Sequence, residues 1–227
     1  MSRDIPGSAN QFITWPIQSI LDDSDLLTVA FWFNTDTVAD FTPLVGLFRD
    51  DIDQRAWAIW IHSGKVRFDT SSNGTFQVNN ISSLTSPGTG SWIHIMCTHE
   101  TATPRNRIYY NGVLEATGTT NVFAGIYDNT DNVNIGGQIL ATAVRWADGR
   151  FANLGIWHDA LGGEEALALA KGVSPRLIRP ASLVGCLPLY GVAFPEIDLG
   201  GNSVEGVQNG TVAASPSRPV SGPPVLF

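Results

Sequence analysis

Every second residue of the segment 27–34 is large and apolar. These residues are Leu27, Val29, Phe31 and Phe33. A period of two residues is that of a β-strand, because successive side chains of a strand point to opposite faces of its sheet. The segment therefore predicts a strand that buries one of its two faces in a hydrophobic core.

Two dipeptides predict tight hairpin turns. Asn111-Gly112 stands between the strand-like residues 107–110 and 113–116, and both of its residues tolerate the positive φ angles of a type I′ turn. Ser63-Gly64 separates two further strand-like runs in the same way. Short alternating or apolar runs predict strands at 12–15, 56–62, 65–70, 93–97, 133–136, 151–157 and 183–189.

One segment, residues 164–171, is typical of a helix. Two glutamates stand in its first turn, Lys171 in its last, and Gly172 follows as a stop, which complements the helix dipole. Many short strands and one short helix predict an all-β protein, an antiparallel β-sandwich of two facing sheets. The core of such a sandwich accommodates seven Trp and eleven Phe residues.

Composition argues against several kinds of partner. The chain has 227 residues, of which 43% are hydrophobic and 15% charged, and this excludes general disorder. The net charge is −8, so the basic surface that neutralises phosphates is missing and no nucleic acid is expected. No apolar run reaches the about 20 residues that span a bilayer, and the lysines are scattered, so no membrane partner is expected.

The cysteines and the two ends of the chain carry further expectations. Cys97 and Cys186 lie in apolar runs and are expected to be buried thiols, with a disulfide between them as the alternative. The first residues do not resemble a secretory signal. The Pro-rich tail 215–227 is expected either as an extended arm that packs on a neighbouring subunit or as a loosely held terminus.

Four longer segments follow one another in a distinctive order. They are Phe12-Ile-Thr-Trp followed by 27–34, Ser91-Trp-Ile-His-Ile-Met-Cys-Thr-His, Ile108-Tyr-Tyr-Asn-Gly-Val-Leu, and the stretch from Asp148 to Glu165. In this order they resemble the opening strands, an inner strand, a hairpin, and the closing strand and helix of the concanavalin A-like, laminin-G-type jelly roll. The resemblance covers residues 12–171 and implies a concanavalin A-like β-sandwich.

The C-terminal third carries a second resemblance. Residues 170–184, Pro195-Glu-Ile-Asp-Leu and Gly222-Pro-Pro-Val are similar to uncharacterised jelly-roll proteins encoded in tailed-phage and prophage genomes. With this variant the resemblance extends over nearly the whole chain. We therefore expect residues 1–214 to form a single jelly-roll sandwich, which residues 183–214 complete from the C-terminal side.

The resemblance raises the question of a glucanase site. Enzymes of the superfamily that cut β-glucans carry Glu-x-Asp-x-x-Glu or a shorter form on one strand, with the carboxylates on one face. This chain has Glu196-Ile-Asp198, and Gly200 and Gly201 stand where the second glutamate belongs. We therefore expect no catalytic residues, and we interpret Asp198 as a cap on its own loop backbone.

Calcium is the other ligand that the family implies. The candidate ligands are Asp50, Asp51, Asp53, Asp128, Asp131 and Asp148. They lack the spacing of an EF-hand, and Phe151-Ala152-Asn153 replaces the family's isoleucine-aspartate-glutamate strand. No metal and no cofactor is therefore predicted. Solvated acidic loops account for these aspartates, and a calcium ion is the alternative.

The histidines and tryptophans are expected to be mainly structural. No zinc-type spacing joins His62, His94, His99 and His158, and the second and third of these are expected on opposite faces of one strand. Opposite faces are also expected for Trp57 and Trp60, whereas Trp32 and Trp92 face away from the aliphatic stripes of their strands. Core packing is the main expectation, and an exposed platform for sugar stacking or subunit contact is the alternative.

These expectations favour a non-enzymatic binding or assembly module. The phage resemblance implies a virion structural protein, either a head-decoration (cement) subunit or a tail-associated module. It would contact major capsid or other virion proteins and sister subunits, be assembled in the bacterial host cytoplasm, and lie on the virion surface. The alternative is a carbohydrate-binding lectin for a host-surface glycan, and a glucanase-type glycoside hydrolase comes third.

Overall fold

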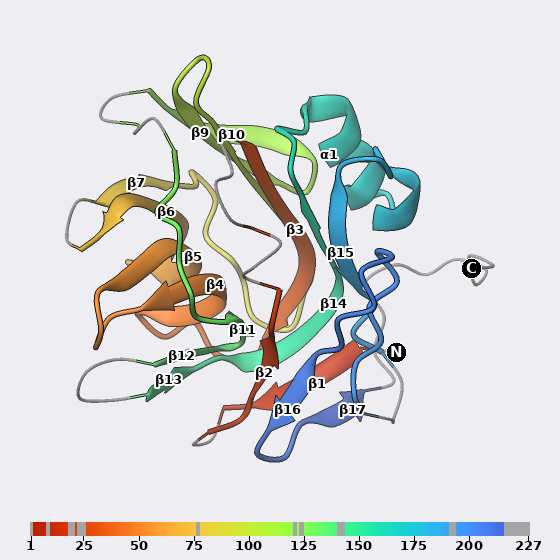
Figure 1. Cartoon of the computed structure of the whole chain (residues 1–227). Helices are drawn as coiled ribbons and strands as arrows, with labels where there is room; N and C mark the ends of the chain where they lie inside the picture. Colours follow the sequence, from red (N-terminus) through yellow and green to blue (C-terminus); the bar gives the residue numbers. More distant parts are fainter. Residues whose placement is uncertain are drawn as a thin grey trace.

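Two antiparallel sheets stack face to face in the computed structural model, which describes residues 2–7, 10–17, 21, 26–75, 78–119, 122, 125–139, 144–190 and 194–215 (Figure 1). The eight-stranded sheet contains β1 (Ser2–Pro6), β3 (Leu26–Thr35), β8 (Trp92–Glu100), β9 (Arg105–Tyr110), β10 (Val113–Gly118), β14 (Asp148–Trp157), β15 (Leu183–Leu187) and β17 (Ala213–Ser215). Its order is β10-β9-β8-β3-β14-β1-β17, with β15 paired to β14.

The second sheet has the order β16-β2-β11-β4-β5-β6-β7. Its strands are β2 (Phe12–Trp15), β4 (Thr42–Arg49), β5 (Gln54–His62), β6 (Lys65–Gly74), β7 (Val78–Ser82), β11 (Val133–Ile135) and β16 (Val207–Asn209). A small hairpin of β12 (Gly137–Ile139) and β13 (Val144–Trp146) contacts β4, and one helix, α1 (Gly163–Ala170), precedes a 3₁₀ turn at Pro175–Leu177. The predicted all-β sandwich with one short α-helix is confirmed.

Both predicted hairpin turns are present. Asn111 and Gly112 have φ angles of 50° and 82°, and Ser63 and Gly64 have 51° and 70°, the positive values that a type I′ turn requires. Every predicted strand occurs, and most are longer than expected. The strands that the sequence patterns did not indicate are β1, β4, β7, β12, β13, β16 and β17.

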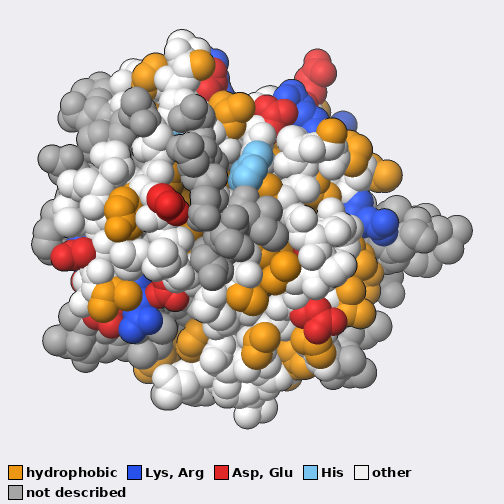
Figure 2. Space-filling view, viewed as in Figure 1, with side chains coloured by type: hydrophobic (Ala, Val, Ile, Leu, Met, Phe, Trp, Pro, Cys, Tyr) orange, Lys and Arg blue, Asp and Glu red, His pale blue; other side chains and the backbone are white. Residues whose placement is uncertain are grey.

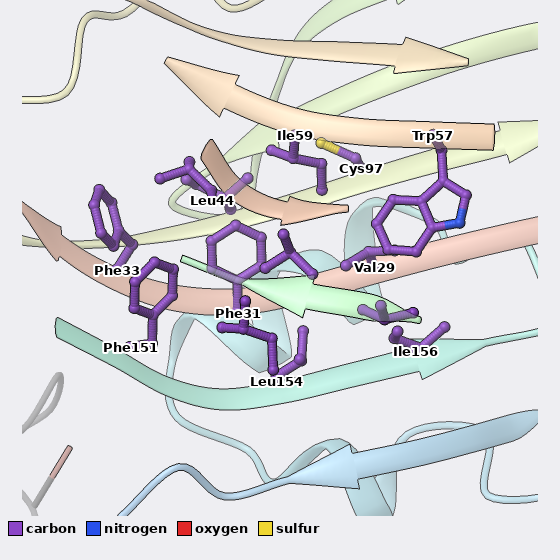
Figure 3. Packing of buried hydrophobic residues seen from close by; sticks show 14 of the residues in the cluster. Val29, Phe31, Phe33, Leu44, Trp57, Ile59, Cys97, Phe151, Leu154 and Ile156 are labelled. Atoms are coloured by element: carbon purple, nitrogen blue, oxygen red, sulfur yellow. The ribbon is translucent and has the colours of Figure 1, made fainter. Parts of the chain in front are cut away.

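The space between the sheets holds the main hydrophobic core. Phe151 of β14 lies between Phe31 and Phe33 of β3, with ring centroids 6.2 and 4.7 Å away. Leu44 of β4 and Trp57 of β5 reach toward them from the other sheet (Figure 3). Burial of each side chain of this size contributes about 1.5–3 kcal/mol, so this layer holds the two sheets together.

The outer face of β3 is buried as well, which corrects the expectation of a strand with only one buried face. Ala30 of β3 and Met96 of β8 pack against Ala166 and Leu169 of α1 in a second apolar cluster. In Figure 1, α1 lies outside the eight-stranded sheet, beyond β3. The short helix therefore covers residues that alternation alone assigns to a solvent-facing side.

Both cysteines are buried free thiols, as their apolar surroundings predict. Burial raises the pKa of the Cys97 thiol well above its usual range and that of Cys186 to about 12. Thiols that remain protonated are poor nucleophiles, so both side chains act as small apolar groups in the core.

The C-terminal segments take part in both sheets. In the eight-stranded sheet β15 pairs with β14 and β17 pairs with β1, while β16 pairs with β2 in the other sheet. Ser215, the first residue of the expected tail, is the last residue of β17, and residues 216–227 lie outside the described part of the chain. Within the described part, no helix is long and apolar enough to cross a membrane.

Candidate functional site

The outer face of the seven-stranded sheet carries a group of aromatic side chains. Along β5, Trp57, Ile59 and Ile61 belong to the core between the sheets, so the alternate residues Trp60 and His62 point away from it. This arrangement confirms that Trp57 and Trp60 lie on opposite faces of one strand.

Four rings on this face form a cluster. Phe41, from the loop before β4, packs edge-on against Trp60 with 5.9 Å between ring centroids, and its centroid lies 4.4 Å from that of His62. The ring centroid of Phe48 of β4 lies 5.8 Å from that of Trp60. We call Phe41, Phe48, Trp60 and His62 the aromatic cluster. Phe41 and His62 are half-buried, so the cluster opens to solvent on their side.

Charged groups of β6 flank the aromatic cluster. Arg67 stands directly opposite Trp60 in the β5–β6 pair, and its guanidinium carbon lies 5.6 Å from the Trp60 ring centroid. The same guanidinium donates from Nε to the Asp69 carboxylate at 2.7 Å. Burial raises the pKa of Asp69, and the Arg67 charge opposes that rise. Arg67 and Asp69 are thus already paired with each other beside Trp60.

The loop before β4 is held in place by one carboxylate. Asp40 accepts hydrogen bonds from the backbone N–H groups of Ser63 at 2.7 Å and Phe41 at 3.1 Å. The Ser63 hydrogen bond, the largest cause, holds the pKa of Asp40 below its usual value. Nδ1 of His62 lies 3.1 Å from the same carboxylate. The position of the Phe41 ring therefore depends on the β5–β6 turn.

The hairpin β12–β13 places two polar side chains against the aromatic cluster. Gln138 lines a narrow hollow together with Phe48 and Trp60, and the free volume of this hollow is about 10 Å³. Its strand partner Arg145 holds its guanidinium 4.3 Å from the Phe41 ring centroid. A hollow of this size admits a single water-sized group, so a ligand would lie across it and insert only one small polar group.

A larger depression lies near α1 and the end of β8, with a free volume of about 460 Å³. Its arginines are paired with carboxylates: Arg105 and Arg107 with Glu100, and Arg179 with Asp159. Because these charges already pair with one another, a ligand in this depression would have to compete with them for hydrogen bonds. The larger volume is therefore the weaker indication of a binding site.

Glu196 and Asp198, the two acidic residues weighed above as part of a glucanase site, are buried and hydrogen-bonded to other groups of the protein. Glu196 accepts a hydrogen bond from Nε of Arg3, and both side chains are buried. Asp198 accepts from the backbone N–H groups of Cys186 at 2.8 Å and Gly200 at 2.7 Å. The second of these bonds is the local backbone cap that the sequence predicts for Asp198.

The aspartates weighed as calcium ligands are dispersed. Asp50 and Asp53 pair with Arg55, and Asp51 and Asp131 pair with Arg49. Asp128 is exposed and Asp148 is half-buried. Among the described residues no three His, Cys, Asp or Glu side chains are grouped so as to hold a metal ion. The carboxylates that pair with Arg49 and Arg55 would have to leave these arginines in order to bind calcium.

The remaining histidines and tryptophans have the faces that alternation predicts. His94 lies against Trp32 on the outer face of the eight-stranded sheet, with 5.3 Å between ring centroids. His99 lies in the interior, where its Nδ1 is 2.7 Å from Oδ1 of Asn106. Trp32 and Trp60 are buried rather than exposed, and Trp92 and His158 are half-buried. An exposed tryptophan platform is therefore wrong for Trp32 and Trp60; the aromatic cluster opens through Phe41 and His62.

Sequence reasoning singled out Trp60 but not Phe41, Gln138 or Arg145. Phe41 has a φ of 58° in a loop without strand or turn signals, and no pattern indicates its position. Gln138 and Arg145 become neighbours only when β12 pairs with β13. The signal for these residues therefore lies in strand register rather than in local composition.

The chain matches one family model. This model, described as concanavalin A-like lectin/glucanases superfamily, matches residues 7–166, more than half of the chain. None of the curated proteins matches the chain.

Solved structures with the same fold are similar at low identity. One is a protein of Bacteroides ovatus whose name describes it, provisionally, as carbohydrate-binding. It is 17% identical with a TM-score of 0.70, and the match covers 96% of this chain and 61% of the Bacteroides chain. The heptameric SAP-like pentraxin of Limulus polyphemus is 17% identical with a TM-score of 0.61, covering 93% and 92%. The CBM40 of the Ruminococcus gnavus IT-sialidase, bound to α2,3-sialyllactose, is 15% identical with a TM-score of 0.56, covering 73% and 96%. This chain thus spans about three fifths of the Bacteroides protein, and the similarity establishes the fold.

Proposed function

The chain belongs to the concanavalin A-like lectin/glucanases superfamily, and from this we propose that it is a carbohydrate-binding module that performs no catalysis. Its ligand is a saccharide, and its binding surface is the aromatic cluster with the polar side chains beside it. Two of the similar structures are named as carbohydrate binders, which supports this choice among the functions that the fold hosts.

The observation that carries the proposal is the combination of rings and polar groups at the aromatic cluster. Sugar rings present C–H faces that pack on aromatic side chains, and their hydroxyl groups need a few well-placed donors and acceptors. Phe41 and His62 supply the half-buried rings that a sugar can reach, and the buried Trp60 supports Phe41 from below. Gln138 and Arg145 supply polar groups beside them. The rings lie on strands and on a loop fixed by Asp40, so little order has to be gained on binding.

Substitution of the rings tests the proposal. A glycan array identifies the ligand, and calorimetry then compares the wild-type protein with Trp60→Ala and Phe41→Ala. Phe41→Ala removes a ring that contacts the sugar, and Trp60→Ala removes the buried ring that supports Phe41. We expect each variant to bind about tenfold more weakly or worse, because loss of an aromatic anchor typically costs more than about 1.4 kcal/mol. Phe41 is half-buried, so its removal disturbs the fold less than removal of Trp60.

Trp92→Ala is the matched control. Trp92 is a half-buried aromatic residue of the eight-stranded sheet, away from the aromatic cluster, and its loss should leave sugar affinity unchanged. Thermal unfolding of all variants separates loss of binding from loss of folding. An array without any bound glycan contradicts the proposal. Release of sugar from laminarin contradicts its non-catalytic part and redirects attention to Glu196 and Asp198.

The phage hypothesis concerns where such a module works. A head-decoration or tail-associated protein that carries a sugar-binding face would attach a virion to host-surface glycan, so the two hypotheses are compatible. The virion-surface location, the capsid partners and the sister subunits stay predictions of the sequence resemblance. Mass spectrometry of purified virions tests them, and absence of the protein from the particles would reject them.

A further inference from the structure

The hairpin β12–β13 presents two polar side chains toward the aromatic cluster. Gln138 and Arg145 stand directly opposite each other in this antiparallel pair, so both side chains leave the same face of the hairpin. Gln138 reaches the hollow beside Trp60, and Arg145 lies over Phe41. A ligand lying across the cluster would meet both.

Gln138 is a buried amide side chain. The side chain is only 4% exposed, and neither its amide nitrogen nor its amide oxygen forms a hydrogen bond with the protein among the described residues. A buried amide that lacks partners is unfavourable, because it has lost its hydrogen bonds to water without replacing them, and native proteins keep few such groups. The amide lines the hollow, where it can donate to and accept from one inserted hydroxyl group.

Arg145 is unusual among the arginines. Most arginines of the described chain form ion pairs with carboxylates, such as Arg67 with Asp69 and Arg150 with Asp36, whereas Arg145, like the exposed Arg176, forms none with a described residue. The carboxylates of the same surface are engaged elsewhere, Asp40 by Ser63 and Asp69 by Arg67. The guanidinium is supported by the Phe41 ring, and its donors have no hydrogen-bond acceptor among the described residues.

From this arrangement we propose that the saccharide bound at the aromatic cluster is acidic and that its carboxylate pairs with Arg145 while a hydroxyl group enters the hollow at Gln138. The planar guanidinium matches a carboxylate with two parallel hydrogen bonds, which a neutral sugar cannot accept as well. This inference rests on the proposed carbohydrate-binding function and specifies its ligand class. Gln138 and Arg145 are its specificity-determining residues.

Matched pairs of acidic and neutral sugars test the inference. Calorimetry compares 3′-sialyllactose with lactose, and a galacturonic acid trisaccharide with the corresponding galactose trisaccharide. We expect one acidic member to bind about tenfold or more tightly than its neutral partner, which is typical of a charge-assisted hydrogen bond. The pair that shows the preference identifies whether the carboxylate belongs to a terminal sialic acid or to a uronic acid.

Variants assign the preference to the two residues. Arg145→Gln should weaken binding of the acidic sugar about tenfold more than binding of its neutral partner and so remove the acidic preference. Arg145→Lys should retain part of the preference, because a lysine keeps the charge without the planar fork. Gln138→Leu should weaken both members of the pair. Arg176→Gln is the control, since Arg176 is exposed, forms no ion pair with a described residue, and its loss changes the net charge equally.

The outcomes separate this inference from the proposed function. Equal affinity for acidic and neutral sugars overturns the acidic ligand and leaves the carbohydrate-binding function standing. An equal loss of the preference in Arg145→Gln and Arg176→Gln also overturns it, because the effect would then come from net charge. Binding of no saccharide overturns the proposed function and the inference together.

Discussion

Two histidines of one strand show how the face of a sheet sets the chemistry of a residue. His94 and His99 both lie on β8, and their sequence numbers differ by an odd number, so they occupy opposite faces. His99 is hydrogen-bonded to Asn106, which donates in turn to Thr70 of the other sheet at 2.9 Å. His94 packs against Trp32 instead, and burial lowers its pKa to about 3.

The low pKa of His94 predicts a pH-dependent stability. In the unfolded chain His94 binds a proton near its ordinary pKa of 6.5, whereas in the folded protein it stays neutral down to about pH 3. The unfolded state therefore binds more protons than the folded state in this window. The contribution of His94 to the free energy of unfolding consequently falls as the pH is lowered, by up to about 1.4 kcal/mol per pH unit. His94→Phe, which keeps a ring against Trp32, should remove this contribution.

Urea unfolding of both proteins at several pH values between 7 and 4 measures the effect. The difference in unfolding free energy between wild type and His94→Phe should change in favour of the variant as the pH falls. Titration of all other groups is common to both proteins and cancels in this difference. A difference that is independent of pH would show that His94 titrates normally in the folded protein.

At the scale of elements, the hairpins were predictable from sequence because their turns are local. Asn111-Gly112 and Ser63-Gly64 adopt positive φ angles within two residues, and the flanking strands alternate. The strand β4 was not predictable from sequence, because register shifts at Pro43/Val45 and Leu47/Phe48 break the period of two. The candidate site was hidden for a related reason: Gln138 and Arg145 meet only through strand pairing, which a single sequence does not display.

The turn of the β9–β10 hairpin also has a packing role. A Cβ atom on Gly112 would lie 2.8 Å from Cα of Leu167 in α1, and its φ is positive. Gly64 has a similar φ, but no atom lies within 4 Å of the corresponding position. We expect Gly64→Ala to destabilise the protein by about 1–2 kcal/mol through backbone strain alone. Gly112→Ala should cost more, because the hairpin must also move away from the helix.

Chemical denaturation of the two glycine variants and the wild type measures both costs. The larger loss for Gly112→Ala is expected to come with weaker packing of α1, which near-ultraviolet circular dichroism of the neighbouring aromatic residues reports. Equal losses in the two variants would mean that the contact between the turn and Leu167 adds nothing to stability.

At the scale of the whole molecule, segments from the two ends of the chain meet beside β14. Strand β1 pairs with β14 on one side and with β17 on the other, so the first and last described strands are neighbours (Figure 1). The buried Arg3–Glu196 pair joins the same two regions, and the Arg3 guanidinium lies 4.0 Å from the Phe194 ring centroid. The sequence resemblance anticipated strands from the C-terminal segment, but no local pattern predicted this ion pair.

The surface reflects the low charge of the chain. Figure 2 shows few charged side chains on the face in view, with positive and negative ones interspersed and apolar ones between them. Because so many arginines are paired with carboxylates, the net charge of −8 is spread rather than gathered in one field. Arg145 has no ion-pair partner among the described residues and can then act on a ligand locally, because the charged neighbours of the aromatic cluster, Asp40 and the Arg67–Asp69 pair, are engaged with other groups.

The Arg3–Glu196 pair allows the contact between the N-terminal and C-terminal segments to be tested. Glu196→Ala removes the carboxylate that pairs with the buried Arg3 guanidinium, and loss of one partner of a buried pair typically costs about 3–5 kcal/mol. For a domain of this size that corresponds to a decrease in Tm of roughly 6–20 °C.

The double variant Arg3→Met/Glu196→Leu removes both charges and should recover most of the loss, because apolar side chains of similar volume also fill such sites. Differential scanning calorimetry of the three proteins decides the matter. If Glu196→Ala unfolds at the wild-type temperature, the pair does not hold the N-terminal and C-terminal segments together.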